Sequence, residues 1–212
     1  TARCKEELVM YRIGLTGGIA SGKSTVVLML KELGASVVDC DVLARDVVRP
    51  GTKGLAAVAA AFGPKAIRED GTMDRAYIGG VVFNDAERKA ELEGILFPLI
   101  YERIDEELRR IDEGEKKSFV FLDMPLLFEI EYQAYVDEVW LVCVDGPTQL
   151  ERLMARNHFS REEAEARIRA QMPAEKKRAL SQVVIDNNGA LAQTEEQVRA
   201  QWALLMDRIQ RG

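Results

Sequence analysis

Histidine is almost absent from this sequence of 212 residues, in which His158 is the only one. This excludes any mechanism that needs two histidines and any metal centre built on a histidine cluster. Cysteine is also scarce, and Cys4, Cys40 and Cys143 stand at spacings that match no metal-binding motif. Because an odd number of cysteines does not suit a disulfide framework, we expect reduced thiols, with Cys143 in a buried strand.

The sequence also lacks an excess of positive charge and any long apolar run. Its net charge of -6 argues against a surface that binds nucleic acid by general attraction to phosphates. No uncharged apolar run approaches the roughly 20 residues of a membrane-spanning helix, and residues 1–9 carry charge where a signal peptide needs an apolar region. We expect a cytoplasmic protein without nucleic-acid or membrane partners, starting at Met10, with residues 1–9 as an upstream extension or a remnant of cloning.

Five short apolar runs predict β-strands. Each run is continuous rather than alternating, which is typical of strands in a parallel sheet that is covered on both faces. Helical patterns separate them, as in βαβ units. We therefore predict a doubly wound α/β fold, a five-stranded parallel sheet with helices on both faces. The predicted strands are 11–16, 36–39, 118–123, 139–144 and 183–186.

The helical patterns carry signals for where helices end, bend and begin. Gly34 should end the helix that follows the first strand. Pro98 should break or kink the long helical pattern over residues 88–111. Ser160 and Glu163 stand three residues apart, as in a capping box at the start of a helix.

The segment GGIASGKS, residues 17–24, fits the phosphate-loop pattern G-x-x-x-x-G-K-[ST] between a predicted strand and a predicted helix. Its glycines let backbone N–H groups close around phosphate oxygens, and the positive end of the following helix favours the anion. Lys23 can reach the β- and γ-phosphates, and the Ser24 hydroxyl can hold Mg²⁺. We predict that the loop binds a nucleoside triphosphate through Gly17, Gly18, Ala20, Ser21, Gly22, Lys23, Ser24 and Thr25.

The loop alone does not identify the reaction. The N-K-x-D motif of GTPases is missing, and 212 residues are too few for a large motor ATPase. A small-molecule kinase needs an acceptor site, a group that orients the acceptor hydroxyl and a lid that excludes water, because phosphoryl transfer depends on positioning and charge stabilisation. A kinase for a nucleoside monophosphate or shikimate is one alternative, and a non-catalytic ATP sensor is another.

Two aspartates follow predicted strands and are candidates for these roles. With the first two strands close together, Asp41 can orient an acceptor hydroxyl, although it can equally cap the helix that follows. Asp123, at the end of the third strand, is placed like a Walker B carboxylate that contacts Mg²⁺. The apolar segment 125–128 after it either contacts a ligand or packs locally.

Basic and amide side chains provide further candidates. Arg45 lies on the same helix face as Asp41 and can reach acceptor phosphates or pair with a carboxylate. Arg152 and Arg156, four residues apart, can stabilise charge in the transition state or belong to a solvated helix face. Asn187 can bind an adenine edge, or simply form the turn after the fifth strand.

Together these segments resemble the dephospho-coenzyme A kinase family, in order and in spacing. The resemblance is carried by LTGGIASGKST (15–25), VVDCDVLARDVVRPG (37–51), DGTMDR (70–75), FPLI (97–100), DMPLLFE (123–129), RLMARN (152–157), ARIRAQM (166–172) and VIDNNG (184–189). It implies transfer of the γ-phosphoryl group of ATP, with Mg²⁺, to the ribose 3′-hydroxyl of dephospho-coenzyme A.

The resemblance also implies a division of the chain and a set of roles. A nucleotide-binding core would comprise 10–44, 116–149 and 181–212, with a helical acceptor domain at 45–115 and a lid at 150–180. The sequence does not give the oligomeric state, and we expect a monomer or a small homo-oligomer. The implied catalytic residues are Lys23, Asp41, which would act as the base, and Arg152. Arg156 and Asn187 would also contact ATP. The acceptor site would comprise Thr16, Asp41, Arg45, Arg75, Phe97, Leu99, Leu127 and Phe128.

One residue departs from the family pattern. Phe97 stands where the family usually has histidine, and its side chain cannot form hydrogen bonds. At this position the side chain can stack or pack, but it cannot take a role that needs a hydrogen bond.

Overall fold

Five strands form one sheet in the order β2-β3-β1-β4-β5. The computed structural model describes residues 10–83, 85–115 and 118–211, so the expectation for residues 1–9 lies outside this part of the chain. β1 pairs in parallel with β3 and β4, and β4 pairs in parallel with β5, which confirms the predicted doubly wound α/β fold. The strands are β1 (Tyr11–Gly17), β2 (Val37–Asp39), β3 (Phe119–Asp123), β4 (Glu138–Cys143) and β5 (Val183–Asp186).

The strand order corrects the expectation that the first two strands lie close together, because β3 lies between β1 and β2. The chain then crosses over β1 to form β4. This makes β1 the central strand and the point where the direction of winding changes, which is where ligands bind in open α/β sheets. On the side of β2, the neighbour of the end of β1 is therefore the end of β3, where Leu15 pairs with Asp123.

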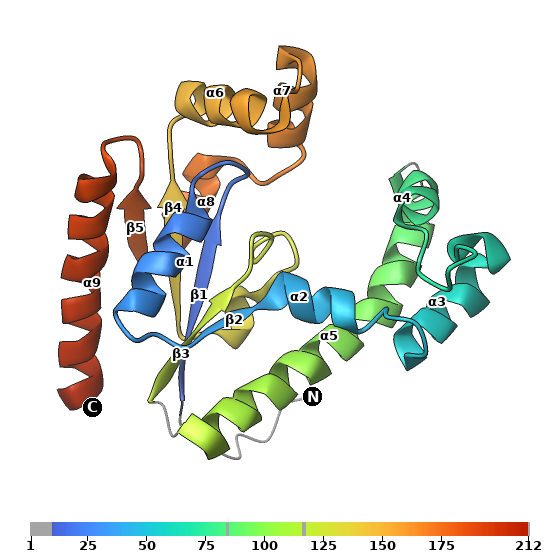
Figure 1. Cartoon of the computed structure of the whole chain (residues 1–212), viewed down its shortest axis with the longest axis horizontal. Coiled ribbons are helices and arrows are strands. Elements are labelled where there is room, and N and C mark those ends of the chain that lie inside the picture. The colour runs from blue at the N-terminus through green and yellow to red at the C-terminus, as the bar shows by residue number, and fades with distance from the viewer. Residues whose placement is uncertain (1–9, 84, 116–117, 212) are drawn as a thin grey trace. The chain divides into compact units, whose positions relative to one another are not determined.

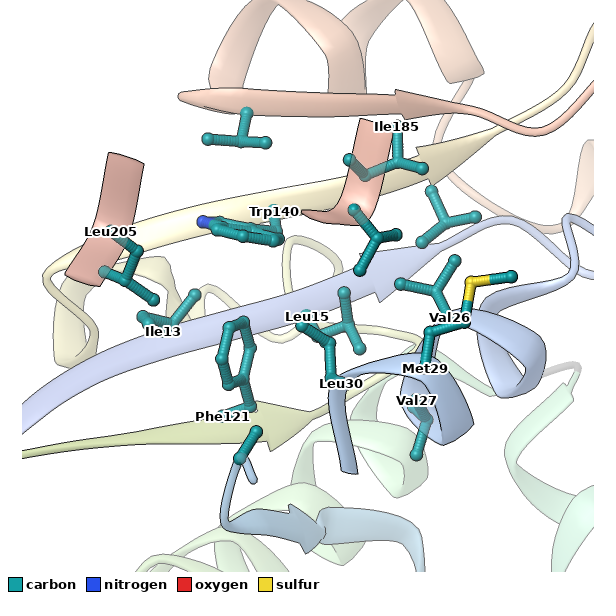
Figure 2. Close-up of a cluster of buried hydrophobic side chains, with 14 of the residues drawn as sticks. Ile13, Leu15, Val26, Val27, Met29, Leu30, Phe121, Trp140, Ile185 and Leu205 are labelled. Carbon is teal, nitrogen blue, oxygen red and sulfur yellow. The ribbon is translucent and has the colours of Figure 1, made fainter. Parts of the chain in front are cut away.

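Apolar side chains fill one face of the sheet beneath α1 (Lys23–Glu32) and α9 (Leu191–Arg211). Continuous apolar strands supply this core, and the Trp140 ring, fully buried, meets Phe121 edge to face at 5.2 Å between centroids. The stripe of α9 packs on the same core through Val198 and Leu205. Figure 2 shows this cluster, with labels on Ile13, Leu15, Val26, Val27, Met29, Leu30, Phe121, Trp140, Ile185 and Leu205.

The chain divides into two compact units. The first unit comprises the described parts of 1–38 and 116–212 and contains the sheet up to Val38. Within it, α6 and α7 lie beyond the carboxyl ends of β1 and β4 (Figure 1), whereas α8 packs on β4. Besides α1 and α9, its helices are η2 (Tyr132–Tyr135), α6 (Gly146–Asn157), α7 (Arg161–Arg169) and α8 (Ala174–Leu180).

The second unit, residues 39–115, is helical and has its own core around Val58, Phe62 and Ile78. Apart from the last residue of β2, its described residues contain no strand, only an isolated bridge between Ile67 and Met73. Its helices are α2 (Cys40–Asp46), α3 (Lys53–Phe62), η1 (Pro64–Ala66), α4 (Arg75–Phe83) and α5 (Ala86–Glu115).

The local signals in the sequence mostly act as predicted. Gly34 follows the end of α1 with φ of 94°, a conformation that glycine adopts without steric cost. Ser160 and Glu163 form the complete capping box of α7. Pro98 lies inside α5, which continues as one helix from residue 86 to 115, so a break at this proline is excluded. Proline removes one hydrogen bond from a helix that its neighbouring turns hold on both sides.

Cys143 is buried in β4, as expected. Arg178 donates to its sulfur over 3.0 Å, while burial raises the pKa of the thiol. Among the described residues, the longest apolar stretches of helix fall short of what a membrane crossing requires.

Candidate active site

The phosphate loop connects β1 to α1 and is held in an unusual backbone conformation. Ala20 and Gly22 both have positive φ, at 59° and 86°. Gly22 is the N-cap of α1, no side chain caps this helix, and its first turn contains no acidic residue. No side chain of the helix therefore occupies its first N–H groups, and no carboxylate in its first turn offsets the positive end of its dipole. An anion-binding site requires both conditions.

Asp123 lies directly against the lysine of this loop. Its Oδ1 forms an ion pair with Lys23 Nζ, and the two side chains are only 13% and 14% exposed. The pairing follows from the fold, because β3 is the neighbour of β1 and Met124 N–H donates to Leu15 O over 2.9 Å. The structure thus brings the predicted lysine and the predicted Walker B carboxylate together.

The donor set at this point suits a magnesium ion that arrives with a nucleotide. No group of three histidine, cysteine, aspartate or glutamate side chains that could hold a metal occurs in 10–83, 85–115 and 118–211. Mg²⁺ in kinases needs few protein ligands, because substrate phosphates and water complete its coordination. The hydroxyl of Ser24, at an exposed position, and the carboxylate of Asp123 fit that smaller requirement.

Asn187 holds the loop from the side of β5. Its Nδ2 donates to Ser21 O and its Oδ1 accepts from Thr194 Oγ1, both at 2.8 Å, and the side chain is buried. A Cβ at Gly22 would collide with this amide. Gly22 is therefore required both by its backbone conformation and by the close approach of Asn187. Contact of Asn187 with adenine stays a prediction.

The two predicted lid arginines are placed differently on α6. Arg152 Nη1 lies 3.9 Å from the point that a Cβ on Gly22 would occupy, so its guanidinium is next to the phosphate loop. Arg156 is exposed, and its Nε donates to Asn157 Oδ1 over 2.8 Å at the end of the helix. Asp145 caps the start of α6, and hydrogen bonds from Thr148 hold the pKa of this carboxyl below its usual range.

Two glutamines that no motif singled out also contact the loop. Gln171 Oε1 accepts from Ile19 N–H over 2.7 Å, and Gln149 Nε2 donates to Ile19 O over 2.8 Å. Gln171 stood inside the segment ARIRAQM without an assigned role. A sequence shows only that a glutamine is long and can both donate and accept hydrogen bonds. It does not show which distant backbone group the side chain will bind.

The segment after Asp123 is mostly interior. Leu127 and Phe128 are buried, which favours local packing, and Leu126 is the exposed residue between Pro125 and Leu127. Thr16 is buried and donates to Pro125 O over 3.1 Å. A role for Thr16, Leu127 or Phe128 in acceptor binding stays a prediction.

The predicted acceptor residues of the second unit are largely on its surface. Asp41 lies in the first turn of α2, but Asp39 is the N-cap and accepts from Val42 N–H over 3.0 Å, so Asp41 does not cap this helix. Arg45, in the last turn of α2, and Arg75, the first residue of α4, are exposed.

Phe97 and Leu99 lie on α5. The ring of Phe97 stacks on Tyr101, with centroids 6.1 Å apart. Leu99 lines a pocket of about 310 Å³ within the second unit, together with Asp46, Val47, Thr52, Lys53, Glu102, Arg103 and Glu106.

Comparison with known proteins gives a consistent result. A family model described as dephospho-CoA kinase matches residues 11–193. A dephospho-CoA kinase of Carboxydothermus hydrogenoformans is 47% identical over 191 residues, covering 90% of this chain and 92% of that protein. One of Staphylococcus haemolyticus is 50% identical over 183 residues, covering 84% and 87%.

Solved structures agree with the sequence relatives. A crystal structure of a Thermus thermophilus protein matches with a TM-score of 0.80 at 37% identity, over 93% of this chain and 97% of that one. A dephospho-CoA kinase from Campylobacter jejuni matches with a TM-score of 0.68 at 28% identity, over 92% and 96%.

Proposed function

Because the chain belongs to the dephospho-CoA kinase family, we propose that it transfers the γ-phosphoryl group of ATP to the ribose 3′-hydroxyl of dephospho-coenzyme A. The products are ADP and coenzyme A, and the enzyme is a phosphotransferase with an alcohol acceptor. The observation that carries this proposal is the phosphate loop with Lys23 against Asp123, in a chain that matches the family model over residues 11–193.

The first unit supplies the groups that bind and stabilise the triphosphate. Lys23 and the N–H groups at the start of α1 bind phosphate oxygens, and Arg152, beside Gly22, stabilises the charge that develops on the transferred group. Ser24 and Asp123 would hold Mg²⁺. With Mg²⁺ bound, charge on the β- and γ-phosphates is partly neutralised.

The second unit supplies the acceptor side. Asp41 takes the proton of the 3′-hydroxyl as the hydroxyl oxygen attacks the γ-phosphorus, while the bond to the ADP oxygen breaks. The exposed guanidinium groups of Arg45 and Arg75 can pair with acceptor phosphates. Phe97 offers packing in place of a hydrogen bond.

We further propose that residues 150–180 act as a lid and 45–115 as the acceptor domain. Arginine-bearing helices next to the phosphate loop suit a lid, which must exclude water during transfer. We also propose a cytoplasmic enzyme, a monomer or small homo-oligomer, without nucleic-acid or membrane partners. The net charge of -6 supports only the part of this proposal that concerns nucleic acid, because binding to phosphates needs an excess of positive charge.

The test is ADP release with dephospho-coenzyme A, beside a control without acceptor and other acceptors, with the product weighed by mass spectrometry. We expect ADP that depends on dephospho-coenzyme A and a product heavier by one phosphoryl group. Treatment with a 3′-nucleotidase, which hydrolyses 3′-phosphate monoesters, would then locate the group. If ADP is released only with another acceptor, the protein is a kinase for that acceptor instead. If ATP binds but no acceptor gives turnover, the result favours a non-catalytic ATP sensor.

A further inference from the structure

Ile19, in the middle of the phosphate loop, has both of its backbone polar groups bound by glutamine side chains. Gln171 accepts from its N–H over 2.7 Å, and Gln149 donates to its carbonyl over 2.8 Å. The N–H belongs to the peptide before Ile19 and the carbonyl to the peptide after it. The two glutamines therefore fix the orientation of both peptide planes that flank this residue.

This constraint matters because the next residue has a costly conformation. Ala20 has φ of 59°, in the left-handed region that a residue with a Cβ adopts at a cost of about 1–2 kcal/mol. Each hydrogen bond from a glutamine contributes roughly 0.5–1.5 kcal/mol. The two hydrogen bonds together therefore contribute a free energy similar to the conformational cost at Ala20, which is enough to hold the loop in this conformation.

Both glutamines come from the segment proposed as the lid or from its edge. Gln149 lies in the first half of α6 and is buried, and Gln171 lies two residues after the end of α7. They approach so closely that a Cβ on Gly18 would lie 2.7 Å from Gln149 Nε2 and 3.8 Å from Gln171 Oε1. The loop and the two ends of the α6–α7 pair are thus packed as one assembly.

The end of this pair is also fastened to the loop after β3. Met172 N–H donates to Glu129 Oε1 over 2.9 Å, and Lys177 Nζ, almost fully buried, binds the same oxygen at 2.8 Å. Lys177 also reaches Pro125 O at 3.3 Å. Residues 171–177 are therefore anchored on Pro125 and Glu129, two and six residues beyond Asp123, and this anchor lets Gln171 position the phosphate loop.

We propose that Gln149 and Gln171 are positioning residues that hold the phosphate loop in its triphosphate-binding conformation and connect it to the base of the lid. The proposal rests on the proposed function in taking ATP as the ligand of this loop. Neither side chain needs to touch ATP, since each acts through the backbone of Ile19. Loss of either should therefore weaken ATP binding rather than acceptor binding.

The test is to measure ATP affinity by calorimetry for Gln171→Met, Gln149→Met and the double variant. Methionine has about the length of glutamine but offers no comparable donor or acceptor. Gln182→Met is the matched control, because Gln182 Oε1 accepts from Val139 N–H over 2.7 Å at the start of β4, away from the loop. Binding is read without an acceptor, so it remains measurable even if dephospho-coenzyme A is not the substrate.

We expect each single variant to raise the Kd for ATP roughly twofold to tenfold. In the double variant, the fold increase in Kd should be smaller than the product of the two single fold increases, because both side chains hold the same residue. The KM for dephospho-coenzyme A and the melting temperature should stay as in the Gln182→Met control. An ATP Kd equal to that of the control, or a loss that only follows the melting temperature, would overturn the proposal.

Discussion

The two compact units differ in how they hold their candidate residues. In the first unit, the phosphate loop is bound by buried side chains of Asn187 and Gln149 and by Gln171. In the second, the candidates Asp41, Arg45 and Arg75 lie at exposed positions. The phosphate loop is thus held by the packing of the first unit, whereas the acceptor candidates of the second unit include exposed side chains on a separately packed helical unit. Substitutions in the two units should therefore separate ATP effects from acceptor effects.

The largest effect is expected from Lys23→Ala. It removes the cation that we propose contacts the transferred phosphoryl group, so turnover should fall by about 10²–10³-fold. Substitution of Lys31, an exposed lysine in the last turn of the same helix, is the matched control. ADP release and the melting temperature measure the two effects, and a folded Lys23→Ala enzyme with near-normal turnover would contradict the role of this lysine.

A separation of turnover from stability is expected at α2. Asp41→Asn should lower turnover by about 10²-fold and leave both the Kd for ATP and the melting temperature nearly unchanged. Asp39→Ala, which removes the helix cap, should instead cost about 1 kcal/mol of unfolding free energy. Kinetics with calorimetry distinguish the two variants, and a drop in melting temperature for Asp41→Asn without a loss of turnover would assign Asp41 a structural role.

A smaller effect is expected at Phe97, where the resemblance to the family implies a histidine. Phe97→His introduces a hydrogen-bonding side chain and weakens the stack on Tyr101, which is worth about 0.5–1.5 kcal/mol. We expect the KM for dephospho-coenzyme A to change by about threefold, within the range of one hydrogen bond, while the Kd for ATP stays constant. An equal change in both constants would show that the two sides are not separable at this residue.

The sequence predicted the elements whose signals are local. Continuous apolar runs located all five strands, Gly34 ended α1, and Ser160 with Glu163 started α7. The phosphate loop was predicted for the same reason, since its glycines, lysine and serine are consecutive in the chain.

Relations between distant segments were harder to predict. The insertion of β3 between β1 and β2 depends on the packing of the whole sheet, as does the contact of Lys23 with Asp123. Leu127 and Phe128 were predicted acceptor contacts, but their burial depends on neighbours far along the chain. Gln149 and Gln171 were missed because a glutamine that binds a distant backbone group has no pattern of its own.

The smallest effect is expected at the start of α7, within the proposed lid. Hydrogen bonds with Ser160 hold the pKa of Glu163 below its usual range. The folded state therefore favours the carboxylate, so this contribution is complete above the unfolded pKa of about 4.3 and is lost as pH falls through the lowered folded value. Glu163→Gln keeps an acceptor for the Ser160 N–H but does not titrate. The melting temperature of the native protein should consequently approach that of Glu163→Gln from above between pH 6 and about pH 3, with ATP affinity at neutral pH unchanged. A difference in melting temperature between the two proteins that stays constant across this pH range would mean that the charge of Glu163 does not contribute to the stability of the capping box.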